Sequence, residues 1–326
     1  MNIQRQKRFL VIVGPTTSGK SALAVKLALE FDGEVISADS RQIYRDLDIA
    51  TGKITNDEMR GVLHHCIDIA DPNERFTVLD WKKEAEKAID DIHARNKLPI
   101  ICGGTGFYIS ALIDGTEFPS VSPDTNEQKR LELKTADELF SELKILDPRR
   151  ARDMEKNGDN KNKRRVARAI IIARALGKVP TLSRSTSDRS KNASSSANIQ
   201  TFFFRVKTWN VQFIGLDLPD IELKERIRAR TLERIKDGMI EEARSLHTGN
   251  TNNFSGLSFE RMREIGLEYK YLADFLENKI SREQLIETII TKDWQYARRQ
   301  RTWWRKDKRI KWFGPEDFER IKLTIL

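Results

Sequence analysis

The sequence contains little of what marks secreted or membrane-spanning proteins. Its 326 residues include two cysteines, Cys66 and Cys102. That is too few for a disulfide framework or a cysteine-based metal cluster, and it is typical of a reducing compartment. No apolar run approaches the roughly 20 residues that a membrane helix needs, and the polar, basic start does not resemble a secretory or transit signal. We therefore expect a cytoplasmic protein that makes no membrane contact.

Acidic residues are scarce in two stretches of the chain. Residues 161–178 hold seven lysines and arginines and no acid, and residues 292–311 hold nine against two acids. Because the whole chain carries a net charge of +9, the remainder is slightly acidic. This segregation favours a polyanionic partner larger than a nucleotide, with nucleic acid the first candidate. Solvated helix faces are the alternative explanation, since charge alone does not identify RNA.

A strand, a glycine loop and a helix follow one another near the start of the chain. Residues 9–13 form a short apolar run that predicts a buried parallel strand, and an apolar-periodic helix begins near residue 22. Loop N–H groups and the helix dipole bind phosphates in this arrangement. Lys20 would add a point charge, and the Ser21 hydroxyl can bind a magnesium ion. The expected pyrophosphate or triphosphate site consists of Gly14, Pro15, Thr16, Thr17, Ser18, Gly19, Lys20 and Ser21.

Two further predicted strands end at the same crevice. The strand that begins at residue 33 ends at Asp39, and side chains just beyond the carboxyl end of a strand face the ligand in an open α/β sheet. The strand 98–102 runs into the Gly-Gly-Thr-Gly turn 103–106 and a helix. We therefore expect Asp39 and the Thr105 hydroxyl near the bound phosphates.

The rest of the chain up to residue 306 alternates between expected strands and helices. These are the strands 64–69, 202–206 and 211–216 and the helices 77–95, 258–278 and 281–306. A further helix presents three arginines at four-residue spacing along one face: Arg226, Arg230 and Arg234. His64 and His65 would point to opposite faces of a strand, which favours structural hydrogen bonds over a shared metal.

These patterns predict an α/β fold with a P-loop NTPase-like parallel sheet flanked by helices. Residues 1–120 and 201–326 would form the catalytic core with C-terminal helices, and residues 121–180 an inserted helical subdomain. Residues 181–200, crowded with serine, asparagine and arginine, predict a flexible linker.

Several motifs in fixed order resemble the tRNA dimethylallyltransferases, the isopentenyl-transferring or IPP transferase family. Besides the phosphate loop, they are Asp-Ser-Arg-Gln-Ile-Tyr at 39–44, Leu-Asp-Ile at 47–49, His-His at 64–65, Gly-Gly-Thr-Gly-Phe-Tyr at 103–108, and Ala-Arg-Arg-Gln-Arg-Thr-Trp at 297–303. The resemblance covers nearly the whole chain, and the blocks at 39–44 and 297–303 are more specific than the phosphate loop. Since no zinc-finger extension follows the last helix, the bacterial form is expected.

The resemblance implies an activity and roles for individual residues. The enzyme would transfer a dimethylallyl group from dimethylallyl diphosphate to the exocyclic amine of the adenosine 3′-adjacent to the anticodon of tRNA. Diphosphate would bind at 16–21 with Mg²⁺ near Ser21. Asp39 matches the general base, Thr105 the threonine near the bridging oxygen of the diphosphate, and Arg230 the arginine that reaches the leaving group. The implied tRNA-binding residues are Ser40, Arg41, Gln42, Arg164, Arg165, Arg168 and Arg263. A monomer is expected.

Three alternatives have the same phosphate loop. A P-loop small-molecule kinase would transfer the terminal phosphoryl group of ATP and would have little use for two basic stretches. A free-adenylate isopentenyltransferase would perform similar chemistry on a nucleotide, and an NTP-gated RNA-binding module would leave the RNA unchanged. The basic stretches favour tRNA as the acceptor, and the loop alone leaves ATP binding open.

Overall fold

The computed structural model describes residues 8–114, 121, 125–180, 209–249 and 256–326. The chain forms two compact units, one from residues 1–113 and 206–326 and the other from residues 114–205. The predicted strand 202–206, the predicted linker 181–200 and the predicted domain boundaries at 120 and 201 lie outside the described residues.

The first unit is built on a parallel sheet of six strands in the order β3-β2-β4-β1-β5-β6. Their bounds are β1 Arg8–Val13, β2 Gly33–Ser37, β3 His64–His65, β4 Leu98–Cys102, β5 Asn210–Leu216 and β6 Ile310–Phe313. β1 is central, and its Val11 pairs with Ile101 on one side and Phe213 on the other. A parallel sheet is buried on both faces, which requires covering helices.

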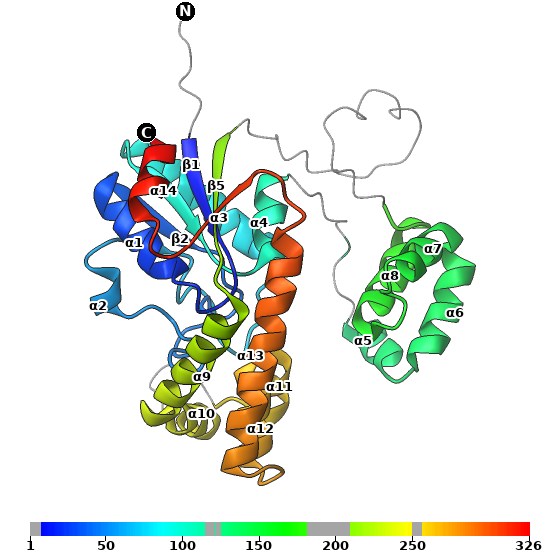
Figure 1. The fold of residues 1–326 in the computed structure, drawn as a ribbon. Helices are drawn as coiled ribbons and strands as arrows, with labels where there is room; N and C mark the ends of the chain where they lie inside the picture. Colours follow the sequence, from blue (N-terminus) through cyan, green and yellow to red (C-terminus); the bar gives the residue numbers. More distant parts are fainter. Residues whose placement is uncertain (1–7, 115–120, 122–124, 181–208, 250–255) are drawn as a thin grey trace, which may run out of the picture. The chain divides into compact units, whose positions relative to one another are not determined.

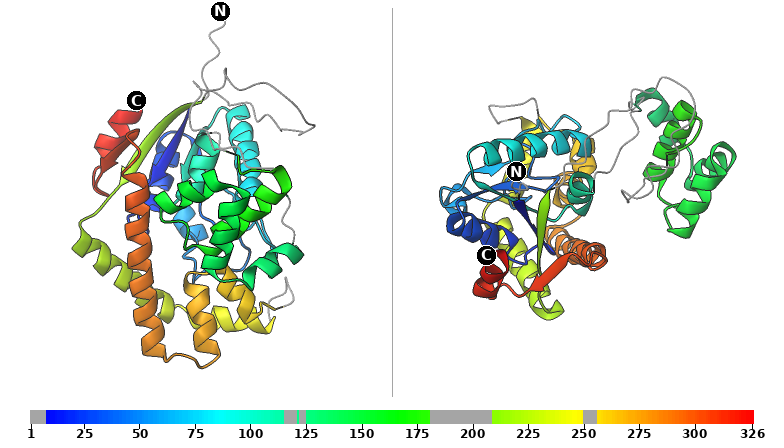
Figure 2. Two further views of the ribbon diagram at one scale, coloured as in Figure 1. Left: turned by 90° about the vertical axis from the view of Figure 1, so that its right-hand side faces the viewer. Right: turned by 90° about the horizontal axis from the view of Figure 1, so that it is seen from above.

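Helices cover both faces of the sheet and extend beyond one end of it (Figures 1 and 2). In this unit they are α1 Lys20–Glu30, α2 Asn56–Met59, α3 Val78–Ala94, α4 Gly106–Ile113, α9 Asp220–Lys236, α10 Met239–Thr248, α11 Phe259–Ile265, α12 Glu268–Leu276, α13 Arg282–Trp304 and α14 Phe318–Ile325. Side chains along β1 alternate between the two faces. Phe9 and Val11 pack into the cluster that contains α3 and α4, whereas Leu10 and Ile12 pack with α1 and α14.

The helices α9 to α13 gather at the carboxyl ends of the strands (Figure 1). They join the sheet through one apolar core, in which Trp304 of α13 is buried with Ile310 of β6. This end of the sheet also carries the phosphate loop, so the C-terminal helices form the other side of the predicted crevice.

The second unit is a bundle of four described helices: α5 Thr125–Glu132, α6 Ala136–Leu146, α7 Pro148–Lys156 and α8 Lys163–Leu176. Leu139, Leu143, Val166 and Ile170 are fully buried in its core. Asp147 caps α7 and Asn162 caps α8. The helical nature of the insert, with breaks near 147 and 157–160, is thereby confirmed.

The predicted strand 64–69 is wrong beyond its first two residues. Cys66 and Asp68 have φ values of 61° and 56°. Backbone in this left-handed region cannot continue a pleated strand, so pairing with β2 ends at His65.

The predicted helix 258–278 is wrong as a single helix. It is two helices, α11 and α12, because Gly266 and Leu267 have φ values of 80° and 48° and interrupt the helical backbone. The apolar pattern continues across the break, so periodicity alone could not locate it.

Three further predicted elements are confirmed, and four short elements were not predicted. The predicted helices 77–95 and 281–306 are confirmed as α3 and α13, each opened by a capping box, and the predicted strand 211–216 is confirmed as β5. The short elements α2, β6, α10 and α14 were not predicted. No helix within the described residues is long and apolar enough to cross a membrane.

Candidate active site

The phosphate loop joins β1 to α1 at the centre of the sheet. Gly19 has a φ of 89° and precedes the first turn of α1, so the loop leads directly into the helix N-terminus. Lys20 folds back over the loop and donates a hydrogen bond to the Pro15 carbonyl oxygen. Burial lowers the pKa of Lys20 to about 8 against the attraction of Cys102 and Asp39, and the nearby Arg230 guanidinium lowers it further. Lys20 is therefore still largely protonated at neutral pH and brings its charge to the loop.

A cavity of about 600 Å³ opens beside this loop. This volume is within the range of small-molecule sites. Its walls come from the phosphate loop, the segment after β2, the turn after β4, and helices α9 and α13. The lining residues that carry polar or charged groups include Thr16, Thr17, Lys20, Ser21, Asp39, Gln42, Arg230, Tyr296 and Gln300. The structure thus brings the phosphate loop, Asp39 and Arg230 together around one space.

Thr105 lies next to the cavity and ties two strand ends together. Its hydroxyl accepts a hydrogen bond from the Ser40 N–H over 3.1 Å, and its own N–H donates to the Ala38 carbonyl oxygen over 3.2 Å. The carboxylate of Asp39 accepts from the Arg41 N–H over 2.9 Å. The hydrogen bond from the Arg41 N–H therefore orients the Asp39 carboxylate, close to Thr105 in the chain fold.

Arg230 reaches the phosphate loop from α9. Its Nη1 donates to the Thr16 hydroxyl over 3.4 Å, and its Nη2 donates to the Gly52 carbonyl oxygen over 3.1 Å. Burial lowers the pKa of Arg230 to about 10, and the neighbouring Arg234 guanidinium adds to the lowering. Arg230 is still protonated at neutral pH and presents its charge at the loop.

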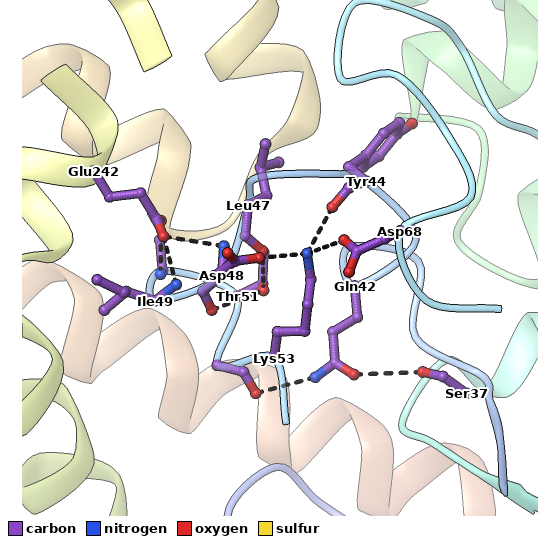
Figure 3. Close-up of polar contacts among 12 residues, drawn as sticks. Ser37, Gln42, Tyr44, Leu47, Asp48, Ile49, Thr51, Lys53, Asp68 and Glu242 are labelled. Atoms are coloured by element: carbon purple, nitrogen blue, oxygen red, sulfur yellow. Dashed lines mark hydrogen bonds and ion pairs between the residues drawn. The ribbon is translucent and has the colours of Figure 1, made fainter. Parts of the chain in front are cut away.

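Two charged side chains, Glu242 and Lys53, hold the polar segment 44–53 in place (Figure 3). Glu242 accepts the consecutive N–H groups of Asp48, Ile49 and Ala50 over 3.0, 2.6 and 3.1 Å. Lys53 donates to the Tyr44 carbonyl oxygen over 2.9 Å and contacts two carboxylates, those of Asp48 and Asp68. These bonds fix the backbone that leads to Gly52, and so they fix the acceptor for Arg230.

In the first unit, the predicted tRNA-binding residues make hydrogen bonds to other residues of the chain. Gln42 donates to the Gly52 carbonyl oxygen over 3.1 Å (Figure 3). Arg41 Nη1 donates to the Ser40 carbonyl oxygen over 3.4 Å. Arg263 donates to the Asp274 carboxylate over 2.8 Å and pairs with Glu277.

The other predicted tRNA-binding residues lie on α8 of the second unit. Arg164 is exposed, and Arg165 pairs with Asp159. Arg168 is half-buried and donates to the Val121 carbonyl oxygen over 2.8 Å. Burial lowers the pKa of Arg168.

Sequence reasoning missed Gln300 and Arg301 as residues that build the site. Gln300 contacts both the phosphate loop and the 103–106 turn. Arg301 is buried and donates to the Asp217 carboxylate over 2.6 Å, and it also contacts Asp220 and the Leu218 carbonyl oxygen. The spacing of Tyr296, Gln300 and Trp303 on one helical face was the signal available in the sequence.

The predicted roles of the two histidines are confirmed as hydrogen bonding. His64 Nδ1 lies 2.9 Å from the Val62 carbonyl oxygen, and His65 Nε2 lies 2.8 Å from the Glu34 carboxylate. Among the residues that the structure describes, no group of three or more His, Cys, Asp or Glu side chains is arranged to hold a metal. Mg²⁺ commonly takes one or two protein oxygens and completes its shell with substrate phosphates and water. Ser21, which lines the cavity, can supply one such oxygen.

The fold and the cavity define the class as an α/β protein in which a strand, a glycine loop and a helix border a cavity of small-molecule size. Residues 42–307 match the model of the family described as IPP transferase. The chain therefore belongs to the IPP transferase family.

Named relatives and solved structures agree with this assignment. A tRNA dimethylallyltransferase from Caldanaerobacter subterraneus is 37% identical over 317 residues, which cover 96% of this chain and 93% of the relative. The crystal structure of a tRNA isopentenylpyrophosphate transferase from Bacillus halodurans is similar with a TM-score of 0.67 at 31% identity, covering 98% of this chain and 96% of that one. A eukaryotic dimethylallyltransferase acting on tRNA gives a TM-score of 0.73 at 26% identity, covering 96% of this chain and 75% of that one.

Proposed function

We propose that this protein transfers a dimethylallyl group from dimethylallyl diphosphate to the exocyclic amine of the adenosine 3′-adjacent to the anticodon of tRNA. One observation carries the proposal: Lys20, Arg230 and Asp39 line the same cavity. The two cations would neutralise a departing diphosphate, and the carboxylate would accept a proton. The names of the relatives supply the choice of prenyl donor and RNA acceptor.

The chemistry of the two substrates explains why the site needs both kinds of group. The exocyclic amine of adenine is a weak nucleophile because its lone pair is delocalised into the ring. An allylic diphosphate becomes a strong electrophile once the charge on its leaving group is compensated. Stabilising charge that develops in the transition state is the largest contribution that such a site can make.

The leaving-group side consists of the phosphate loop and Arg230. Loop N–H groups, Lys20 and the Arg230 guanidinium would contact the diphosphate oxygens, and Thr105 would lie near the bridging oxygen. Mg²⁺ held by Ser21 would supply further charge compensation when bound. Diphosphate departs with the electron pair of the broken C1–O bond.

The acceptor side is centred on Asp39. The adenine nitrogen forms a bond to C1 of the dimethylallyl group, and the amine proton passes to the Asp39 carboxylate. General-base assistance of this kind contributes about 10² to 10⁴ in rate. The target base must leave its stack to reach the cavity, as in other enzymes that modify bases.

The RNA is proposed to bind through the basic stretches 161–178 and 292–311. Exposed cations such as Lys163 and Arg164 on α8 can contact phosphates without breaking the core of that unit. The prediction that the enzyme is a cytoplasmic monomer remains part of this proposal.

Mass spectrometry of nucleosides tests the function directly. Unmodified tRNA is incubated with the protein, Mg²⁺ and dimethylallyl diphosphate, then digested. The proposal expects one dimethylallyl group on adenosine. Phosphoryl transfer from ATP to a small molecule would favour the kinase, prenylation of free AMP but not tRNA would favour the adenylate enzyme, and RNA of unchanged mass would favour a binding module.

A further inference from the structure

We propose that Gln300 is a positioning residue for prenyl transfer, because its side chain holds the phosphate loop and the 103–106 turn in fixed register. The inference rests on the proposed function. It begins from one amide that bonds to both of these segments, each of which contributes to the walls of the cavity.

The geometry of this amide is fully determined by its partners. The Thr16 N–H donates to Gln300 Oε1 over 2.7 Å, and Gln300 Nε2 donates to the Gly104 carbonyl oxygen over 3.1 Å. A backbone N–H requires an acceptor and a carbonyl requires a donor, so only one orientation of the amide satisfies both. Gln300 is 5% exposed, and water therefore competes little for either bond.

The surrounding residues are shaped for this contact. A β-carbon at Gly104 would lie 2.1 Å from Gln300 Nε2, so any other residue would displace the amide. The next residue, Arg301, also fixes this turn of α13, because it donates to the Asp217 carboxylate and the Leu218 carbonyl oxygen. The amide therefore extends from a rigid base.

Gln300 connects Arg230 and Thr105, the two side chains expected at the leaving diphosphate. Its Oε1 accepts the Thr16 N–H, and the Thr16 hydroxyl in turn accepts a hydrogen bond from Arg230. Gly104, to which Gln300 donates, immediately precedes Thr105. Without the amide, the loop and the turn can shift relative to each other. A misplacement of about 1 Å can cost about 10² in rate.

Gln300→Met removes both hydrogen bonds while keeping the length of the side chain, and Gln212→Met is its matched control. Gln212 accepts from Arg8 Nη2 over 3.1 Å and donates to the Thr324 carbonyl oxygen over 2.5 Å, away from the cavity. Single-turnover transfer by Gln300→Met should fall about tenfold or more, with the donor KM changed less than about threefold. Gln212→Met should stay within about twofold of wild type, since it loses a similar pair of bonds outside the site.

Amide hydrogen exchange supplies a readout that does not depend on activity. Peptides that contain Thr16 and Gly104 should exchange faster in Gln300→Met than in wild type, and should be unchanged in Gln212→Met. Unaltered exchange in Gln300→Met, or a transfer rate within twofold of wild type, would overturn the inference. If wild type itself transfers no prenyl group, the proposed function fails, and the exchange result alone decides whether Gln300 holds the two segments together.

Discussion

The guanidinium of Arg230 donates to the Gly52 carbonyl oxygen over 3.1 Å, and a β-carbon at Gly52 would lie 2.1 Å from the same guanidinium nitrogen. Gly52 also has a φ of 58°, in the region that side chains disfavour. The absence of a side chain at Gly52 therefore leaves the space that the Arg230 guanidinium occupies.

Gly52→Ala should slow transfer by about tenfold or more, because the added methyl displaces Arg230 from the phosphate loop and also collides with Arg234 Nη2, which would lie 1.8 Å away. Gly61→Ala is the control, since Gly61 has a φ of 79° and open space around its Cα. Both changes add backbone strain of about 1 kcal/mol, but only the first should reduce the single-turnover rate. Equal rates for the two variants would show that crowding at Gly52 is unimportant for catalysis.

Arg230→Ala should lower the rate of transfer by about 10² to 10³, because it removes a charge that faces the departing diphosphate. Arg228 lies on the same helix, is exposed and pairs with Glu287. Arg228→Ala should retain nearly the wild-type rate. Single-turnover kinetics with saturating tRNA measure both, and an Arg230→Ala rate close to that of Arg228→Ala would remove Arg230 from the leaving-group side.

The lowered pKa of Lys20 predicts that the kcat/KM for dimethylallyl diphosphate decreases at alkaline pH. A lysine with a pKa of about 8 loses its charge as the pH rises through 8. The kcat/KM for dimethylallyl diphosphate should therefore fall above pH 8, since this quantity reports groups of the free enzyme. In Lys20→Arg the guanidinium stays protonated, so this decrease should disappear even if the overall rate is lower. A fall that persists in Lys20→Arg would assign the decrease to another group.

The features that the sequence predicted correctly are those set by neighbours along the chain. The run 9–13 and the phosphate loop are local patterns. The rule that ligands bind at the carboxyl ends of parallel strands correctly placed Asp39 at the cavity and Thr105 next to it. The last long helix was predicted to begin at Ser281, which is the N-cap of α13.

What the sequence did not reveal depends on residues far apart in the chain. Gln300 and Thr16 are 284 positions apart and meet only because α13 folds back over the sheet. The break at Leu267 follows from a backbone conformation that an apolar pattern does not encode. β6 has four residues and charged neighbours, and it becomes a strand through its pairing with β5.

Binding of tRNA should weaken steeply with salt, because phosphate contacts release counterions. Arg164 is exposed on α8, and Arg164→Gln should reduce the slope of log affinity against log salt by about 1. Arg228→Gln, outside both basic stretches, should leave the slope unchanged. Filter binding across a range of salt concentrations measures this, and a flat dependence for wild type would contradict the role assigned to the basic stretches.

The role of Asp39 is the central claim, and a single-turnover assay of Asp39→Asn tests it most directly. Asparagine keeps an oxygen for the Arg41 N–H but cannot accept the amine proton. With tRNA and dimethylallyl diphosphate at saturation, and prenylated adenosine measured by mass, the rate should fall by about 10² to 10⁴, while diphosphate affinity changes little. A rate within a few-fold of wild type would contradict the account.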